Sequence, residues 1–173
     1  MRPLVMGALI LINYVLQTSV LPHVAIFGVI PDTALVFVVS YGVLRGDVEG
    51  AIFGLSAGIL QDLFSGGPIG MFALFGLLIG YASGKPFRDF FKDNYFLPFF
   101  IVLIAMLFQQ FMIYISSFLL LGHINLALYA RTIILPTTIY TALLAIPLYS
   151  LLHFINGRVE RFEQARRNLF ERE

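Results

Sequence analysis

Residues 50–70 read GAIFGLSAGILQDLFSGGPIG and place glycine at every fourth position, except at Asp62, which interrupts an otherwise apolar run. Four residues turn an α-helix by about 400°, so such a row drifts only about 40° per step. Gly50, Gly54 and Gly58 therefore share one face. Lipid tails are as apolar as leucine, so membrane helices associate where small residues let their backbones approach. The row predicts a central, tightly packed membrane helix whose glycine face contacts another helix.

The composition is typical of an integral membrane protein. The 173 residues are 59% hydrophobic and 12% charged, with a mean hydropathy of +0.89. Soluble domains contain roughly 45–50% apolar and about 25% charged residues. Cysteine is absent, which excludes disulfides, thiolate metal sites and a catalytic cysteine. The net charge of +1 gives no reason to expect a nucleic-acid partner.

Charged and turn residues divide the chain into apolar segments. We expect an all-α polytopic membrane protein, a six-transmembrane-helix bundle with a domain at residues 1–155 and a cytoplasmic helical tail at 156–173. The expected spans are residues 3–21, 31–45, 48–64, 68–84, 95–121 and 131–155. A spanning helix needs about 20 residues, so the second, third and fourth spans are short. The alternative has four spans, with the third and fourth segments forming a re-entrant hairpin.

The basic residues predict the orientation in the membrane. With the N-terminus in the cytoplasm, the inner face collects Arg2, Arg45, Lys85, Arg88, Lys92, Arg158, Arg161, Arg166, Arg167 and Arg172. Only Arg131 is left on the outer face. Because basic residues are enriched on the cytoplasmic side, we expect both termini in the cytoplasm. A re-entrant hairpin would preserve the same distribution, so the number of spans stays open.

Three charged residues are expected at one level near the outer face. Asp32 begins the second segment, Asp62 lies near the outer end of the third, and Arg131 begins the sixth. One hypothesis pairs Arg131 with Asp62 or Asp32. Asp32 is equally suited to a helix N-terminus, where negative charge is favourable. For Asp62 the alternative is contact with a partner or ligand, the usual role of an acid inside a membrane.

The sequence carries no recognisable catalytic pattern. It has no phosphate-binding loop, no GxSxG and no HExxH, and its three histidines are not spaced as metal ligands. Only Asp32, Asp62, His23 and His123 are outer candidates for a catalytic cluster. Asn13, Gln17, Gln109 and Gln110 are amides at membrane depth, which usually bond across helices. We therefore expect no enzyme, no cofactor and no metal.

An ordered series of residues between positions 31 and 84 resembles a known family. The series is Pro31-Asp32, Arg45-Gly46, Glu49-Gly50-Ala51, Gly54, Gly58, Asp62-Leu63, Ser65-Gly66, Gly70 and Gly80-Tyr81. It is similar to the bacterial rod shape-determining protein MreD family, as are the length, the six expected spans and the short basic tail. The motif residues that carry over are Arg45, Gly50, Gly54, Gly58 and Asp62, in a structural or partner-binding role.

The resemblance implies a function and a fold. Family members are non-catalytic components of the complex that builds the lateral cell wall. They act with the bitopic protein MreC and, through it, with a penicillin-binding transpeptidase, a SEDS-family glycosyltransferase and MreB filaments. The implied fold is similar to the substrate-binding subunits (S-components) of energy-coupling-factor vitamin transporters.

Two functions follow from these observations. The first is a scaffold in which the glycine face or a neighbouring helix binds MreC or a second copy of this chain. The alternative is a substrate-binding membrane subunit of a vitamin-type transporter. Such subunits typically carry an AxxxA-type docking motif in the first helix, whereas the first helix here reads GALILINYVLQTSV. We therefore favour the scaffold.

Overall fold

The computed structural model describes residues 2–25, 28–65, 70–85, 96–121 and 126–170, and every element that these residues form is a helix. The helices are α1 (Arg2–Val15), α2 (Thr33–Arg45), α3 (Asp47–Ser65), α4 (Met71–Gly84), α5 (Leu97–Leu121), α6 (Leu126–Tyr129) and α7 (Leu135–Phe170). Short π- and 3₁₀-helical turns extend α1 over Leu16–Val20 and Leu21–Val24, and a π-helical turn at Ala130–Ile134 joins α6 to α7. Gly66, Arg88, Lys92, His123 and Arg172 lie outside the described residues.

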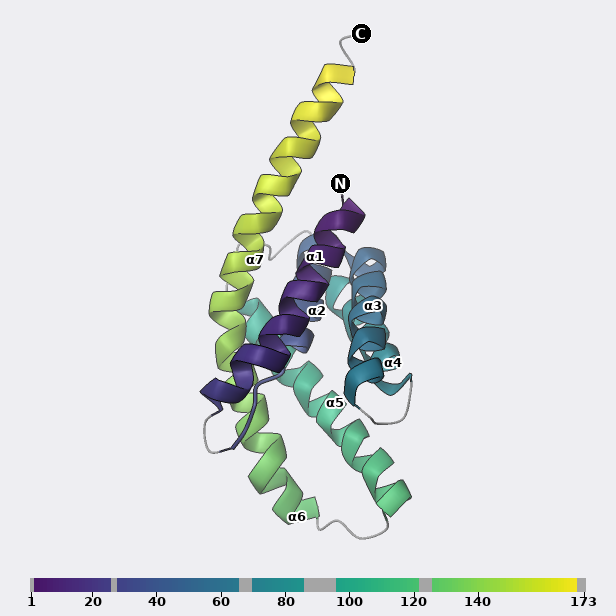
Figure 1. Ribbon diagram of the computed structural model, residues 1–173, viewed down its shortest axis with the longest axis vertical. Helices are drawn as coiled ribbons and strands as arrows, with labels where there is room; N and C mark the ends of the chain where they lie inside the picture. Colours follow the sequence, from purple (N-terminus) through teal and green to yellow (C-terminus); the bar gives the residue numbers. More distant parts are fainter. Residues whose placement is uncertain (1, 26–27, 66–69, 86–95, 122–125, 171–173) are drawn as a thin grey trace.

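Helices α1 to α5 run in alternating directions through the bundle, and α6 continues into α7, which runs back toward the first residues of α1 (Figure 1). Both termini lie at one end, which we call the termini end, and the opposite end is the distal end. The helix α3 and its neighbour α4 form an antiparallel pair on one side of the molecule, and α5 and α6 reach furthest toward the distal end. This alternation is the arrangement expected of a multi-pass membrane protein.

The helix boundaries follow from local chemistry. Helix α2 begins after Asp32, whose carboxylate accepts a hydrogen bond from the Leu35 amide at 3.0 Å. It ends at Gly46, whose φ of 103° is accessible mainly to glycine, and α3 follows without a further linking residue. Helix α4 begins after Gly70, which has a φ of 97°. Within the segment that we expected to begin at residue 68, helix α4 thus begins at Met71.

Pro98 is the second residue of α5, where its missing N–H group is harmless. Pro136 is the second residue of α7 and directly follows the π-helical turn that joins α6 to α7. Pro147 lies inside α7, and the helix nevertheless continues. Helix α7 also runs without a break across residue 155, where we placed the end of the membrane domain.

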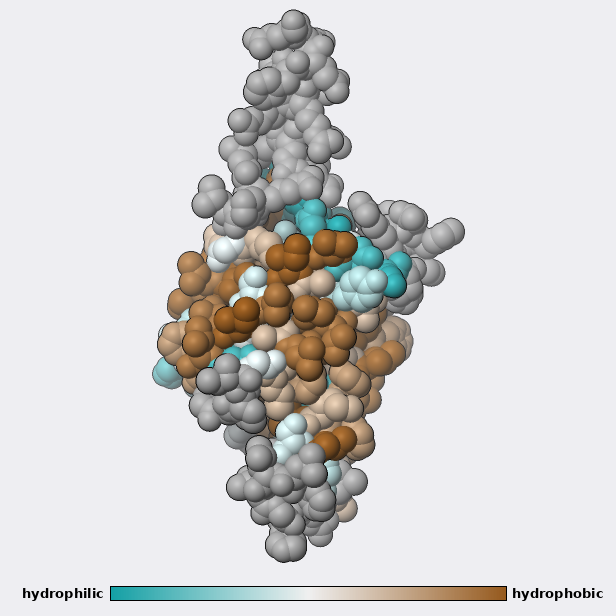
Figure 2. All heavy atoms as spheres, turned by 90° about the vertical axis from the view of Figure 1, so that its right-hand side faces the viewer, coloured by the Kyte–Doolittle hydropathy of each residue, from teal (hydrophilic) through white to brown (hydrophobic). Residues whose placement is uncertain are grey.

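Several helices are long and apolar enough to cross a membrane. Within the described residues, three meet this description, at Val5–Val24, Leu97–Ser116 and Ala127–Val159, and α2 and α4 are shorter apolar helices. Helix α3 has 19 residues, of which Asp47, Glu49 and Asp62 are acidic. The space-filling view shows a broad apolar surface over the middle of the molecule (Figure 2). Such exposed apolar area is rare on soluble proteins and suits contact with lipid.

The central helix is α2, not α3 as we predicted. Every residue from Thr33 to Leu44 is buried, whereas α3 exposes Val48, Ile52, Ile59 and Leu63. A helix that is apolar on all sides is expected in the core of a bundle, and α2 carries no charge before Arg45. The glycine row marks one closely packed face of α3 and leaves its other faces exposed.

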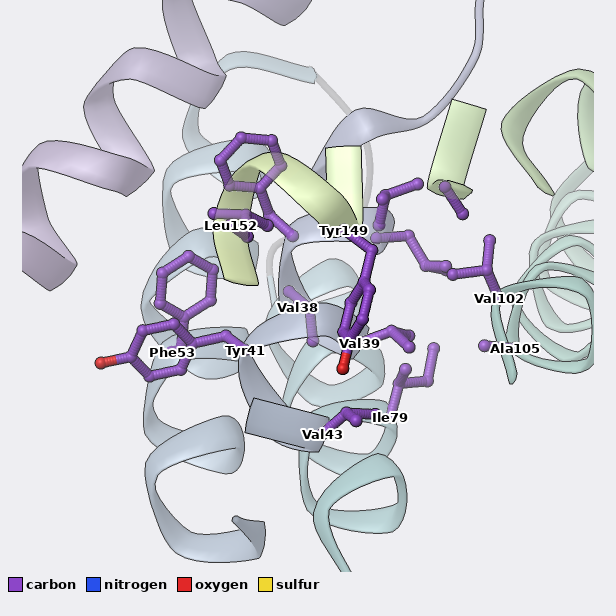
Figure 3. Packing of buried hydrophobic residues seen from close by; sticks show 14 of the residues in the cluster. Val38, Val39, Tyr41, Val43, Phe53, Ile79, Val102, Ala105, Tyr149 and Leu152 are labelled. Carbon is purple, nitrogen blue, oxygen red and sulfur yellow. The ribbon is translucent and has the colours of Figure 1, made fainter. Parts of the chain in front are cut away.

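The core lies between α2 and its neighbours (Figure 3). On the α3 side, the Tyr41 ring stacks on Phe53 with centroids 4.5 Å apart. On the other side, Val39 and Val43 lie near Tyr149 of α7, which is fully buried. Val102 and Met106 bring α5 into the same apolar cluster.

Candidate functional site

The glycine row of α3 lies directly against α4. Gly50 faces Gly80, Gly54 faces Gly76, and Gly58 faces the backbone of Phe72. A Cβ atom at Gly50 would lie 2.5 Å from the Gly80 carbonyl oxygen, and one at Gly54 would overlap the Gly76 carbonyl group. These glycines therefore allow the two backbones to touch, and we call this contact the glycine seam.

Two further contacts bring α2 into the glycine seam. A Cβ at Gly42 would lie 2.7 Å from the Gly80 carbonyl oxygen, and one at Gly84 would overlap the backbone at Gly46 and lie 2.5 Å from Asp47 Cα. Three helices thus meet backbone to backbone near the termini end. Our sequence interpretation missed the α4 half of the seam. The signal was present, because Gly76, Gly80 and Gly84 repeat at the same four-residue spacing.

The glycine face is consequently occupied within the molecule. We expected this face or a neighbouring helix to receive MreC or a second copy, and α4 of the same chain covers Gly50, Gly54 and Gly58. A partner helix would have to displace α4 to reach these glycines.

Asp62 lies at the distal end of the glycine seam. Its side chain is only 5% exposed, and its two carboxylate oxygens accept hydrogen bonds from the Phe72 and Ala73 amides, both at 3.0 Å. Those N–H groups are in the first turn of α4, where no partner exists within the helix. The acid on α3 thus acts as the N-terminal cap of α4, and its negative charge suits that helix end.

The charge pair that we hypothesised is not formed among the described residues. Arg131 is exposed in the π-helical turn before α7, and no ion pair joins it to Asp62 or Asp32. Both acids instead bind amide groups at helix starts. The hypothesis relied on opposite charges at one depth and overlooked the unsatisfied N–H groups of α2 and α4, which are nearer acceptor partners.

Asp32 belongs to a polar cluster that joins four helical segments at the start of α2. Its second carboxylate oxygen accepts a hydrogen bond from Gln109 of α5 at 2.9 Å, and its backbone N–H donates to Thr141 of α7 at 3.0 Å. Gln17, in the turn after α1, accepts from both the amide and the hydroxyl of Thr33. The same Gln17 donates to the Pro31 carbonyl. Gln109 and Gln17 thus bond across helices.

Arg45 is the last residue of α2 and lies at the termini end. Its side chain is half-buried and, with Leu9 of α1 and Leu152 of α7, lines a small apolar pocket. Its Nε atom is buried without a hydrogen-bond partner among the described residues. The guanidinium group thus lies where three helices meet.

An apolar groove of about 630 Å³ separates α4 from α5 in their termini-end halves. Its walls are mostly large side chains, including Leu78, Phe100 and Ile104, and Ala82 and Ala105 leave room between them. At its edge, the Lys85 ammonium group lies 4.5 Å from the centre of the Tyr81 ring. A hydrogen bond with the Tyr81 side chain raises the pKa of Lys85 above its usual value.

The arrangement contains no centre for metal chemistry in the described part of the chain, where no three acidic, histidine or cysteine residues cluster. Its distinctive features are the glycine seam, the polar cluster and the open groove. The family model described as rod shape-determining protein MreD matches residues 1–155. No curated protein and no solved structure matches the chain, so the expected similarity to vitamin-transporter subunits has no support.

Proposed function

The chain belongs to the MreD family of rod shape-determining proteins, and on this premise we propose that it is a membrane scaffold of the bacterial cell-elongation complex. The family match over residues 1–155 carries the proposal, because it spans every described helix except the end of α7. The family is non-enzymatic and determines rod shape. A scaffold acts by holding partners together, so the relevant features of the chain are its surfaces.

The proposed direct partner is the bitopic protein MreC, and the proposed contact is the α4–α5 groove. The groove is apolar and lies along membrane helices, so a transmembrane helix can enter it from the lipid. Ala82, Ser83 and Ala105 line it with small side chains, which favour close helix approach. Through MreC the chain would act with the penicillin-binding transpeptidase, the SEDS-family glycosyltransferase and MreB.

We further infer six membrane spans, with both termini in the cytoplasm of the inner membrane. The distribution of basic residues and the alternating helix directions in Figure 1 support this topology. Helices α2 and α4, with 13 and 14 residues, are each only about 20 Å long, against about 30 Å of hydrocarbon. Because neighbouring helices surround α2 on all sides, lipid does not need to match its length.

Photo-cross-linking in cells tests the partner and the groove together. A photoreactive amino acid at Leu78 or Ile104, both exposed in the groove, is expected to capture MreC. The same amino acid at Ile139 or Leu143, which are exposed on α7, is the matched control and should capture much less. Capture of MreC from α7 alone would refute the groove. Capture of a second copy of this chain from the groove would instead identify it as a homodimer surface.

Co-purification in mild detergent discriminates the scaffold from the alternative, a substrate-binding subunit of a vitamin-type transporter. The scaffold predicts recovery of MreC and wall-synthesis enzymes with the tagged chain. Recovery of an ATPase module with a bound vitamin, and of no wall-synthesis protein, would reverse the assignment.

A further inference from the structure

A second cavity lies away from the groove, between α1 and α3 in their distal halves. It is a cleft of about 210 Å³, which is large enough for a small polar group together with water. The turn after α1 contributes Gln17 and Thr18 to its wall, and α2 contributes only Ala34. The Tyr14 and Phe64 rings lie 4.8 Å apart and connect α1 to α3 at this place.

Two amide side chains line this cleft without hydrogen bonds to other described residues. Asn13 is only 5% exposed, yet its Oδ1 atom is buried with no partner. Gln61 of α3 lines the same cleft and is half-buried, and no hydrogen bond joins it to another described residue. Gln17, by contrast, is fully engaged with Pro31 and Thr33. An unpartnered buried amide is costly, so a built polar site is present here.

The remaining lining determines what the two amides would bind. No charged residue lines the cleft, so an ionised group would be desolvated without compensation. Ile10, Leu60 and Phe64 make the other walls apolar. Phe64 and Thr18 are exposed, so the cleft opens on the lateral surface rather than deep in the core. A ligand must therefore combine a neutral hydrogen-bonding group with an apolar body.

We propose that the α1–α3 cleft binds the neutral, hydroxyl-bearing head of a membrane amphiphile, with Asn13 and Gln61 as its hydrogen-bonding residues. A hydroxyl group can donate to the Gln61 side-chain carbonyl oxygen and accept from the amide N–H groups of Asn13 or Gln61. The apolar tail would leave the cleft beside Phe64 and enter the bilayer. This site is separate from the α4–α5 groove and does not depend on MreC.

Photolabelling of the full chain tests the site. The probe is an alkyl glucoside with a diazirine in its chain, offered to protein in nanodiscs of phosphatidylcholine, which has no free hydroxyl group. We expect labelled peptides from residues 10–18 and 57–64. A permethylated probe, which cannot donate hydrogen bonds, should label them about fivefold less, since a neutral hydrogen bond changes affinity by a factor of about 2 to 12.

Matched variants separate binding from folding. Asn13→Leu and Gln61→Leu should each reduce labelling about fivefold, whereas Gln110→Leu, a buried amide on α5 outside the cleft, should leave it unchanged. The thermal midpoint of Asn13→Leu should not fall, because the buried oxygen has no protein partner to lose. A lowered midpoint with unchanged labelling would show a purely structural residue and overturn the proposal.

Competition between the photoreactive probe and unlabelled amphiphiles identifies the head group that the cleft prefers. Unlabelled monoacylglycerol or unlabelled alkyl glucoside should abolish the labelling, and whichever is stronger names a glycerol or a sugar head. Labelling that resists both, or that is spread evenly over the lipid-facing helices, would mean that the cleft holds only water. Cross-linking of MreC at Leu78 is expected to persist in Asn13→Leu, so the two proposals can fail independently.

Discussion

The glycines of the seam are required for their size, because α4 backbone lies where a side chain would project. Gly54→Ala would drive its Cβ into the Gly76 carbonyl group, which cannot rotate away. Overpacking a core costs about 1–3 kcal/mol, and we expect the upper end here because the obstacle is backbone. The thermal midpoint in detergent should fall clearly, and rod-shape complementation should weaken.

The matched control for the seam is a helical glycine with free space around it. Gly7 of α1 has no atom within 4 Å of the position that a Cβ would occupy, so Gly7→Ala should be tolerated. Alanine in a helix interior is favoured over glycine by about 0.5–1 kcal/mol, so the midpoint should stay equal or rise slightly. Equal loss of stability in the Gly7 and Gly54 variants would contradict the close contact.

Asp62 is expected to act as a hydrogen-bond acceptor and not as an ion-pair partner. Asp62→Leu leaves two buried amides of α4 without a partner, at about 1–3 kcal/mol each, while Asp62→Asn keeps one acceptor oxygen and should lose less. Thermal midpoints of the two variants would show this order. Equal midpoints for both variants would argue against the capping role.

Exchanging charges tests the same residue in a different way. The double variant Asp62→Arg with Arg131→Asp should be no more stable than Asp62→Arg alone, because the carboxylate is bound to the Phe72 and Ala73 amides and not to Arg131. If the double variant recovers expression and cell shape, an ion pair between Asp62 and Arg131 would instead be supported.

At the scale of elements, the start of α2 is the point where α1, α5 and α7 are tied together. Gln109→Leu removes the hydrogen bond to Asp32, and a buried polar group left without its partner costs about 1–3 kcal/mol. Gln110→Leu is the control, because this neighbouring amide is also buried but the hydrogen bond to Asp32 comes from Gln109. Proteolysis of membrane vesicles should cut the Gln109 variant faster. A similar cleavage rate for both variants would show that the hydrogen bond between Gln109 and Asp32 contributes little to stability.

The sequence predicted these elements well where a charge or a turn residue limits them. Arg45 and Gly46 separate α2 from α3 in the structure within two residues of the expected limits. Helix α4 begins at Met71 after Gly70, inside the segment that we expected from residue 68. The short α6 and the π-helical turn before Pro136 were missed, because Arg131 was interpreted as the start of the sixth span, whereas the helical chain already begins at Leu126.

Contacts between elements were harder to predict than the elements themselves. The spacing of Gly50, Gly54 and Gly58 indicated a close approach but could not say which helix approaches. A second row at Gly76 and Gly80 was needed to identify α4, because glycines on both helices allow the closest approach of their backbones. Likewise, the all-apolar sequence of α2, and not the glycines of α3, indicated the central position.

At the scale of the whole molecule, the cysteine-free chain permits a clean test of topology. Single cysteines at Val48 and Lys85, both exposed near the termini end, should react with a membrane-impermeant thiol reagent only after the inner membrane is opened. Cysteines at His23 and Leu128, exposed near the distal end, should react in intact spheroplasts. The opposite pattern would invert the orientation inferred from the basic residues.

One further position distinguishes six spans from four. Leu63 is exposed in the last turn of α3, close to the distal end. If α3 and α4 both cross the membrane, Leu63→Cys approaches the outer interface and should react in intact spheroplasts at a rate near that of His23→Cys. In a re-entrant hairpin that enters and leaves on the cytoplasmic side, the same residue would lie at the bottom of the loop, within hydrocarbon. It would then stay unreactive both before and after the inner membrane is opened. The glycine seam and its Asp62 cap form in either arrangement, so only this accessibility separates a full antiparallel pair of spans from a hairpin inserted from one side.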